Sequence, residues 1–251
     1  MIFRYKAIIE YDGTDFHGWQ SQGGLLSVQG IIEQAILYFT KQQSVCLYGA
    51  GRTDSKVHAL AQVAHFDLEH KVDLYKFQGS LNYFLRKYAV VIISLQEVPC
   101  SFHARFSAVR KTYVYKIINR NADLAIYKNK AWLIRGDLNI SIMNDAAYLF
   151  KGLYDFKYFR YSKCQSKSSI KTIEHVTLQC NKTENQNEIE LNFTAISFLH
   201  KQVRMMVGAI CNAGLGRIRL ADIENALTLR TPLPSPLTAP AHGLYLKSVE
   251  Y

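Results

Sequence analysis

The stretch GAGRTDSKVHA, residues 49 to 59, decides how the rest of this sequence is interpreted. It follows a short apolar segment, Val45 to Gly49, and precedes another, Gln62 to Leu68, so the pattern indicates a loop between two strands. It is not a known type of phosphate-binding loop, because it lacks Gly-Lys-Ser/Thr and the G-x-G-x-x-G spacing. It offers a carboxylate, Asp54, two residues from Arg52, although an aspartate in a loop could also be a plain turn residue.

Strands and helices are expected to alternate on both sides of this loop. Phe3 to Tyr11 is apolar enough for a strand, and Ser27 can cap a helix whose apolar residues recur at helical spacing from Val28 to Phe39. A second helix is predicted from Asp73 to Lys87, and a β-branched strand from Ala89 to Val98. This order favours α/β or α+β packing over an all-helical bundle.

After Pro99 the same plan starts again. The predicted helices are Ser141 to Lys151 and Leu199 to Ala213, the second ended by Gly214. The predicted strands are Lys111 to Ile118, Ile173 to Cys180, Glu188 to Thr194 and Gly243 to Val249. We therefore expect two sub-domains of similar α/β design, residues 1–104 and 105–251.

Composition limits the class of protein. Of 251 residues, 49% are hydrophobic and 20% charged, which is typical of a folded chain and excludes disordered or collagen-like ones. No apolar run approaches the ~18 residues of a membrane span. The N-terminus reaches Glu10 and Asp12 before a secretory segment could form, so we expect a cytoplasmic protein. The five cysteines are scattered without a Cys-x-x-Cys pair, and we expect reduced, mostly buried thiols and no metal site.

Positive charge is concentrated in the second part of the chain. Residues 1–104 carry 9 basic and 9 acidic side chains, whereas residues 105–251 carry 21 and 11. Two stretches, residues 105–120 and 156–171, combine cations with aromatic rings and contain no carboxylate. Such stretches suit a nucleic acid whose phosphates bind cations and whose unpaired bases stack on rings. A solvated basic face is the simpler alternative.

The loop at residues 49–59 resembles the Gly-Arg-Thr-Asp-x-Gly-Val-His-Ala signature of the tRNA pseudouridine synthase A family. The resemblance runs along nearly the whole chain. Matching residues include Tyr11-Asp12-Gly13-Thr14, Gly18-Trp19-Gln20, Ser27-Val28-Gln29-Gly30, Gln62-Val63-Ala64-His65-Phe66, Phe102-His103-Ala104-Arg105-Phe106-Ser107-Ala108, Tyr113-Val114-Tyr115, Phe198-Leu199-His200, Val203-Arg204, Val207-Gly208 and Ala239-Pro240-Ala241-His242-Gly243-Leu244-Tyr245-Leu246.

The resemblance implies a fold and an activity. The fold would be the α+β pseudouridine synthase fold, in which two similar sub-domains with mainly antiparallel sheets meet at a central basic cleft. The activity would be isomerisation of uridine to pseudouridine at positions 38, 39 and 40 of the tRNA anticodon stem-loop. The family's enzymes work as homodimers without a cofactor, so the expected partners are tRNA and a second copy, with no nucleotide cofactor, metal or membrane.

Residue by residue, the resemblance makes Asp54 the catalytic carboxylate and Arg204 its pairing partner. Arg52 would help to displace the target base from its stack, and Tyr113 would stack on the displaced uracil. The reaction breaks the N1–C1′ bond and joins C1′ to C5, for which a positioned carboxylate is suited. The sequence leaves open whether Asp54 adds to the base, adds to the sugar or removes a proton.

Substrate contacts are also expected from charged and polar residues outside this set. These are Lys56, His58, Arg105, Lys157, Arg160 and Lys163, in addition to Arg52 and Tyr113. Two departures stand out, since Lys56 occupies a glycine position of the family and Lys201-Gln202 replaces His-Met. They keep open a second hypothesis, a tRNA-binding protein of the same fold with lost or weakened catalysis.

Overall fold

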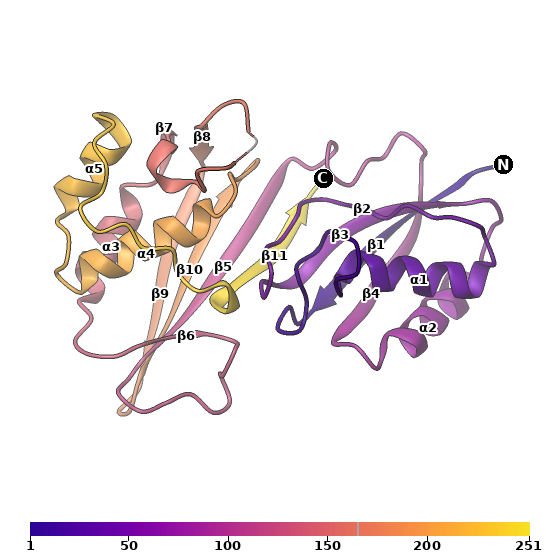
Figure 1. Cartoon of the computed structure of the whole chain (residues 1–251), viewed down its shortest axis with the longest axis horizontal. Helices are drawn as coiled ribbons and strands as arrows, with labels where there is room; N and C mark the ends of the chain where they lie inside the picture. The colour runs from indigo at the N-terminus through magenta and orange to yellow at the C-terminus, as the bar shows by residue number, and fades with distance from the viewer. Residues whose placement is uncertain (165) are drawn as a thin grey trace. The chain divides into compact units, whose positions relative to one another are not determined.

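The structure is a computed structural model that describes residues 1–164 and 166–251. The chain divides into two compact units, one formed by Met1–Val109 together with Tyr245–Tyr251 and the other by Arg110–Leu244 (Figure 1). The last seven residues thus pack with the first unit, whereas the sequence analysis placed them in the second sub-domain. The assignment of catalysis to residues 1–104 and of RNA binding to residues 105–251 stays a prediction.

The sheet of the first unit is built around β1 (Phe3–Tyr11), as predicted. β1 pairs antiparallel with β3 (His58–Leu68) on one side and with β4 (Val90–Val98) on the other. The short β2 (Tyr48–Gly49) pairs antiparallel with β3, and β11 (Leu244–Glu250) runs parallel to the start of β3. β3 begins four residues earlier than the sequence predicted, so the loop with Asp54 leads directly into it.

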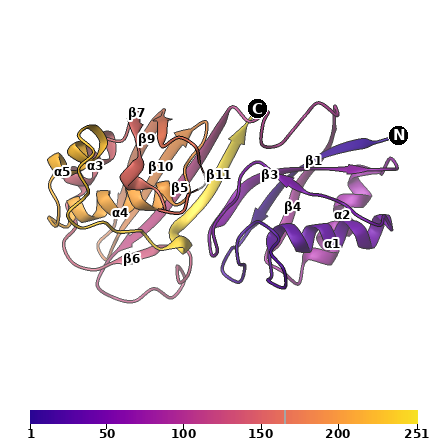
Figure 2. The ribbon, with the colours of Figure 1, turned by 45° about the horizontal axis from the view of Figure 1, so that its top comes forward.

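Two helices cover one face of this sheet (Figures 1 and 2). α1 (Val28–Thr40) is capped by Ser27, as predicted. α2 (Leu74–Leu85) is capped by Asp73. Phe66 of β3 meets Phe77 of α2 with ring centroids 6.5 Å apart, which identifies the face that the helices bury.

The opposite face of this sheet is covered by the segment that follows β4. Ala104 packs with Ala50 and Val63 in a small buried cluster. Tyr251 donates a hydrogen bond to the carbonyl oxygen of Ala104 at 2.7 Å, and its ring contacts Phe102. Residues 99–109 therefore belong structurally to the first unit.

The sheet of the second unit is antiparallel at its centre. β5 (Arg110–Asn119) pairs with β10 (Asn187–Ala195), which pairs with β9 (His175–Lys182). The remaining strands are β6 (Trp132–Ile134), parallel to β5, and the separate antiparallel pair β7 (Gly152–Asp155) and β8 (Ile170–Ile173). β6, β7 and most of β8 were not predicted, since each spans only three or four residues, and the predicted strand Ile173 to Cys180 corresponds mainly to β9.

The described residues of this unit also form three α-helices and two 3₁₀ turns. They are α3 (Ile140–Tyr148), η1 (Lys157–Phe159), α4 (Gln202–Gly214), α5 (Leu220–Thr228) and η2 (Ala241–Gly243). α3, α4 and α5 lie together on one side of β5, β9 and β10 (Figures 1 and 2). Helices and mainly antiparallel sheet occur in both units, so the predicted α+β class is confirmed.

The boundaries of α4 differ from the prediction. Its first turn was expected at Leu199. Lys201 instead adopts a left-handed conformation with φ +62°, and the helix starts at the next residue, Gln202. Gly214 is not the stop residue, because it lies inside the helix. A Cβ there would come within 2.5 Å of Met143 in α3, so Gly214 permits close helix packing. The left-handed glycine after the helix is Gly216, with φ +69°.

The prediction of mostly buried thiols is wrong. Only Cys211 is buried, Cys46 and Cys100 are exposed, and Cys164 and Cys180 are partly exposed; all five are free. The exposed thiols lie outside regular strands and helices, where apolar spacing does not indicate burial.

Candidate active site

Two backbone hydrogen bonds hold the part of the loop that precedes Asp54. The Ala50 N–H donates to the carbonyl oxygen of Val63 at 2.7 Å, and the Trp19 N–H donates to the carbonyl oxygen of Thr53 at 3.2 Å. The Tyr11 hydroxyl lies 2.7 Å from the Thr53 hydroxyl oxygen, and both residues are buried. The residue before Asp54 is therefore fixed through its backbone and its side chain, while Asp54 itself stays partly exposed.

A tight turn follows Asp54. The Val57 N–H donates to the carbonyl oxygen of Asp54 at 3.1 Å, and the turn is reached through Lys56 with φ +66°. The Ser55 hydroxyl and the Lys56 N–H both donate to the carbonyl oxygen of Phe16, at 3.1 and 3.3 Å. This position needs a left-handed backbone, which explains why a glycine suits it.

Two glycines of the segment before α1 lie directly against this loop. A Cβ at Gly13 would come within 2.0 Å of the carbonyl oxygen of Val57. A Cβ at Gly18 would come within 2.6 Å of the carbonyl oxygen of Thr53, and Gly18 also has φ +98°. No other residue fits either place without moving the Asp54 loop.

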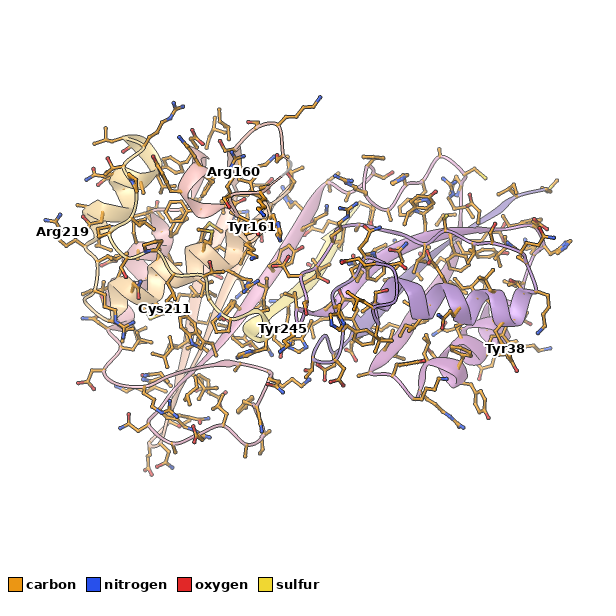
Figure 3. All side chains as sticks on the ribbon, viewed as in Figure 1. Tyr38, Arg160, Tyr161, Cys211, Arg219 and Tyr245 are labelled. Atoms are coloured by element: carbon orange, nitrogen blue, oxygen red, sulfur yellow. The ribbon has the colours of Figure 1, made fainter. Side chains whose placement is uncertain are left out.

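His58, at the start of β3, holds Gly13 in place beside the Asp54 loop. It is 1% exposed, its Nδ1 accepts a hydrogen bond from the Gly13 N–H at 3.0 Å, and its ring stacks on Tyr245 with centroids 4.5 Å apart. Figure 3 labels Tyr245 at the start of β11. These contacts fix His58 beside the segment before α1, and its expected substrate contact stays a prediction. Arg52, by contrast, is exposed on the loop.

Tyr113 and Arg204 belong to the second unit. Tyr113 lies in β5 opposite Phe193, is 8% exposed, and meets the ring of Phe198 edge-on at 5.2 Å. Arg204, in the otherwise largely buried α4, donates from Nε to the carbonyl oxygen of Ala239 at 2.8 Å. The chain thus presents Arg52, Asp54 and Lys56 on one loop, and Tyr113 and Arg204 on two separate elements of the other unit.

The predicted basic stretch at residues 156–171 is only partly available to a ligand. Phe156 and Phe159 are fully buried and pack around Phe150, so these two rings cannot stack on bases. Tyr158, Arg160 and Tyr161 remain partly exposed, and the cations Lys157 and Lys163 of the same stretch are exposed. Figure 3 labels Arg160 and Tyr161 beside each other at the end of η1.

The other basic stretch, residues 105–120, is less free than its sequence indicated. Arg110 pairs with Glu174 at 2.5 Å and Lys116 with Glu190 at 3.5 Å. Arg105 is exposed. It follows Ala104, whose N–H bonds to His65 on β3, and His65 lies well beyond the end of β3 that adjoins the Asp54 loop.

Sequence reasoning missed the residues that hold the loop. Tyr11, Gly13, Gly18 and Thr53 were recognised as motif positions without a role. The two glycines were the available signal, since a glycine in such a motif often marks a left-handed backbone or a close approach.

Within the part of the chain that the structure describes, no three His, Cys, Asp or Glu side chains are grouped so that they could hold a metal ion. Among the same residues, no helix has the length and apolar character needed to cross a membrane.

Comparison with known proteins agrees with the fold and the loop. The profile of the family described as tRNA pseudouridine synthase matches residues 7–107 and 146–251. "tRNA pseudouridine synthase A" of Ehrlichia ruminantium (strain Welgevonden) is 44% identical over 249 residues, 99% of this chain and 99% of that protein. The proteins of the same name from Anaplasma phagocytophilum (strain HZ) and Ehrlichia chaffeensis (strain ATCC CRL-10679 / Arkansas) are 46% and 45% identical, over 99% of this chain and 100% of each protein.

These matches and the α+β fold define the class of protein as an isomerase that acts on uridine in RNA. More particularly, the chain belongs to the tRNA pseudouridine synthase family, as its sequence motifs indicated.

Proposed function

We propose that the protein converts uridine to pseudouridine at positions 38, 39 and 40 of the tRNA anticodon stem-loop, with Asp54 as the catalytic carboxylate. The observation that carries this proposal is the Asp54 loop. The loop is held by the bond of Thr53 to Tyr11 and by the turn at Lys56, and it packs against two glycines so closely that a side chain at either one would clash with it. Such rigidity is what a carboxylate needs to act on one glycosidic bond.

The other roles follow the family resemblance residue by residue. Arg52, exposed on the same loop, displaces the target base from its stack. Tyr113 stacks on the displaced uracil, and Arg204 pairs with Asp54. Arg204 donates from Nε to the carbonyl oxygen of Ala239, and a guanidinium is a planar fork of N–H donors whose geometry matches a carboxylate.

Binding of tRNA rests on exposed cations. Lys157, Arg160 and Lys163 follow one another around η1, and Lys56 and Arg105 add two from the first unit. We further propose, from the family resemblance and the composition alone, that the enzyme is a homodimer and works in the cytoplasm.

The second candidate function, a tRNA-binding protein with weak or no catalysis, is favoured by one observation. Lys56 places a β-carbon at a left-handed position two residues after Asp54. Strain there could move the carboxylate, because displacements of a fraction of an ångström slow a reaction.

Two measurements test the proposal. Pseudouridine mapping of tRNA from cells with and without the gene shows activity and position together. In vitro, Asp54→Asn should abolish product while tRNA affinity stays within several-fold, because the basic surface supplies the binding. Asp73→Asn is the matched control, since it makes the same change at the cap of α2, where asparagine also caps. Activity in Asp54→Asn, or equal loss of binding and turnover, would contradict the assigned role.

A further inference from the structure

Four rings form a row on a surface of the first unit. Tyr48 stacks on His65 with centroids 5.0 Å apart, His65 meets His103 edge-on at 4.6 Å, and His103 meets Phe106 at 4.3 Å. The two end rings face solvent, since Tyr48 is 50% exposed and Phe106 is 76% exposed. This aromatic row therefore offers ring surface that the chain itself does not cover.

Hydrogen bonds to the two histidines hold the aromatic row in place. His65 is 2% exposed, and its Nδ1 accepts a hydrogen bond from the Ala104 N–H at 3.1 Å. His103 Nδ1 accepts from the N–H groups of Arg105 and Phe106, at 3.1 and 3.3 Å, which closes the turn that presents Phe106. A partner that binds here loses little free energy to ordering of the surface.

The charge around the row is positive. The Arg105 guanidinium lies 5.6 Å from the centre of the Phe106 ring and forms no ion pair with the residues that the structure describes. The sequence contains no Asp or Glu between Val98 and Ala122. Asp67, two residues after His65 on β3, is already bonded to Arg4 at 2.7 and 2.8 Å. Exposed rings with an adjacent guanidinium suit a partner that carries both bases and phosphates.

The row lies away from the Asp54 loop within the same unit. His58 begins β3 just after that loop, and His65 is seven residues further along the strand. At ~3.3 Å per residue the separation is roughly 23 Å. A ligand on the row is therefore not the nucleotide that reacts.

We propose that the aromatic row binds unpaired bases of the tRNA substrate outside the anticodon stem-loop, with Tyr48 and Phe106 stacking on bases and Arg105 contacting a phosphate. This inference rests on the proposed function and adds a second RNA contact to it. A second copy of the chain fits the surface less well, because a two-fold contact centred on the row would bring Arg105 against Arg105.

The test compares two RNA probes, a full-length tRNA transcript and the isolated anticodon stem-loop. For Tyr48→Ala and Phe106→Ala, the Kd and KM for full-length tRNA should rise about five- to tenfold, the effect of losing one stacked base. The kcat, and the Kd for the stem-loop, should stay unchanged. Arg105→Gln should lower the slope of log affinity against log salt for full-length tRNA by about one.

The matched control is Tyr83→Ala. Tyr83 is 63% exposed on α2, with the Arg86 guanidinium 4.1 Å from its ring centre, so it combines the same groups at another place in this unit. Tyr83→Ala should leave both affinities unchanged, and melting temperatures should show that all variants fold.

Three results would overturn the inference. One is an unchanged Kd of Phe106→Ala for full-length tRNA, and another is an equal loss on the stem-loop. The third is a lower mass of Phe106→Ala by sedimentation, which would make the row a contact between copies. Absence of pseudouridine from the unsubstituted protein would overturn only the proposed function, because the Kd still reports on the row.

Discussion

The hydroxyl groups of Tyr11 and Thr53 lie 2.7 Å apart in a buried place, 42 residues apart in sequence. This bond joins the end of the central strand β1 to the residue before Asp54. The Trp19 N–H also bonds to the carbonyl oxygen of Thr53. The two bonds therefore tie the residue before Asp54 to β1 and to the segment that precedes α1.

Removal of this bond should slow the reaction more than it weakens binding. In Tyr11→Phe the Thr53 hydroxyl stays buried without its partner, at a cost of about 1 to 3 kcal/mol in the free energy of unfolding. We expect kcat to fall at least tenfold, because Asp54 is held less firmly, while the Kd for tRNA changes little. The measurement is single-turnover pseudouridylation at saturating enzyme.

Tyr5→Phe provides the control. Tyr5 is a buried tyrosine of the same strand, and its hydroxyl accepts a hydrogen bond from the Val72 N–H at 3.2 Å, away from the loop. It should lose stability without losing kcat. If both variants kept the kcat of the unsubstituted enzyme, the bond would serve stability alone.

Replacement of Lys157, Arg160 and Lys163 by glutamine should change the salt dependence of tRNA binding. If each cation contacts a phosphate, the slope of log affinity against log salt should decrease by about two to three. The rate from bound substrate should not change, since none of the three is assigned to the chemistry.

The control for this prediction is a triple glutamine variant of Lys71, Lys87 and Arg219, which removes the same charge. Each of these cations is engaged within the chain, with Glu97, with the rings of Phe84 and Tyr88, and with Asp222. A similar change of slope in both triple variants would mean that net charge, and no particular surface, accounts for the binding.

Local signals made much of the fold predictable. The apolar pattern of β1 and the capping serine before α1 lie within short stretches of sequence, and both elements have the predicted starts. α5 has apolar residues at helical spacing, Leu220, Ile223, Ala226 and Leu227, so its signal was present although no helix was predicted there.

Other features depend on contacts between distant residues. The left-handed Lys201 that delays α4 has no local signature, because lysine rarely adopts this conformation. The motif identified Asp54 and Arg52, but the bonds that hold them come from β1 and from the segment before α1. The burial of Phe156 and Phe159 inside a basic stretch likewise depends on Phe150.

Stability should decrease in mild acid because of His65. Burial, followed by the charges of Arg4 and His103, lowers its pKa to about 4, while Asp67 acts in the opposite direction. The unfolded chain, with a histidine pKa of about 6.5, binds more protons than the folded protein between these values. Stability is therefore lost as the pH falls through this range, by about 2 kcal/mol between pH 7.5 and pH 5.

Denaturant titrations at the two pH values check this. His65→Gln keeps an acceptor for the Ala104 N–H and should remove this part of the pH dependence. Asp67→Asn should keep it, because Arg4 lowers the pKa of that carboxyl and it titrates at lower pH. Equal pH dependence in His65→Gln and the unsubstituted protein would exclude His65 as the cause.

Lys56 differs from the other left-handed cations of the described chain. Lys41 lies over the ring of Tyr38, Lys201 over the ring of Tyr161, and Arg230 pairs with Asp155. Lys56 forms no ion pair with the described residues, yet it accepts a backbone strain of about 1 kcal/mol or more relative to glycine. The turn nevertheless keeps its bond from the Val57 N–H to Asp54.

We therefore expect Lys56→Gly to change the rate of the chemical step less than about tenfold, or ~1.4 kcal/mol. The loop already has the shape that glycine would adopt. If the exposed lysine side chain contacts an RNA phosphate, tRNA affinity should fall in Lys56→Gly and its salt slope should decrease by about one. Lys41→Gly is the control, since it removes the same charge from the same backbone conformation at the end of α1. The measurement is single-turnover pseudouridylation of an anticodon stem-loop by the unsubstituted protein and by Lys56→Gly. If the unsubstituted protein gave no product and Lys56→Gly gave it readily, Lys56 would have disabled the site, and the chain would be a tRNA-binding protein.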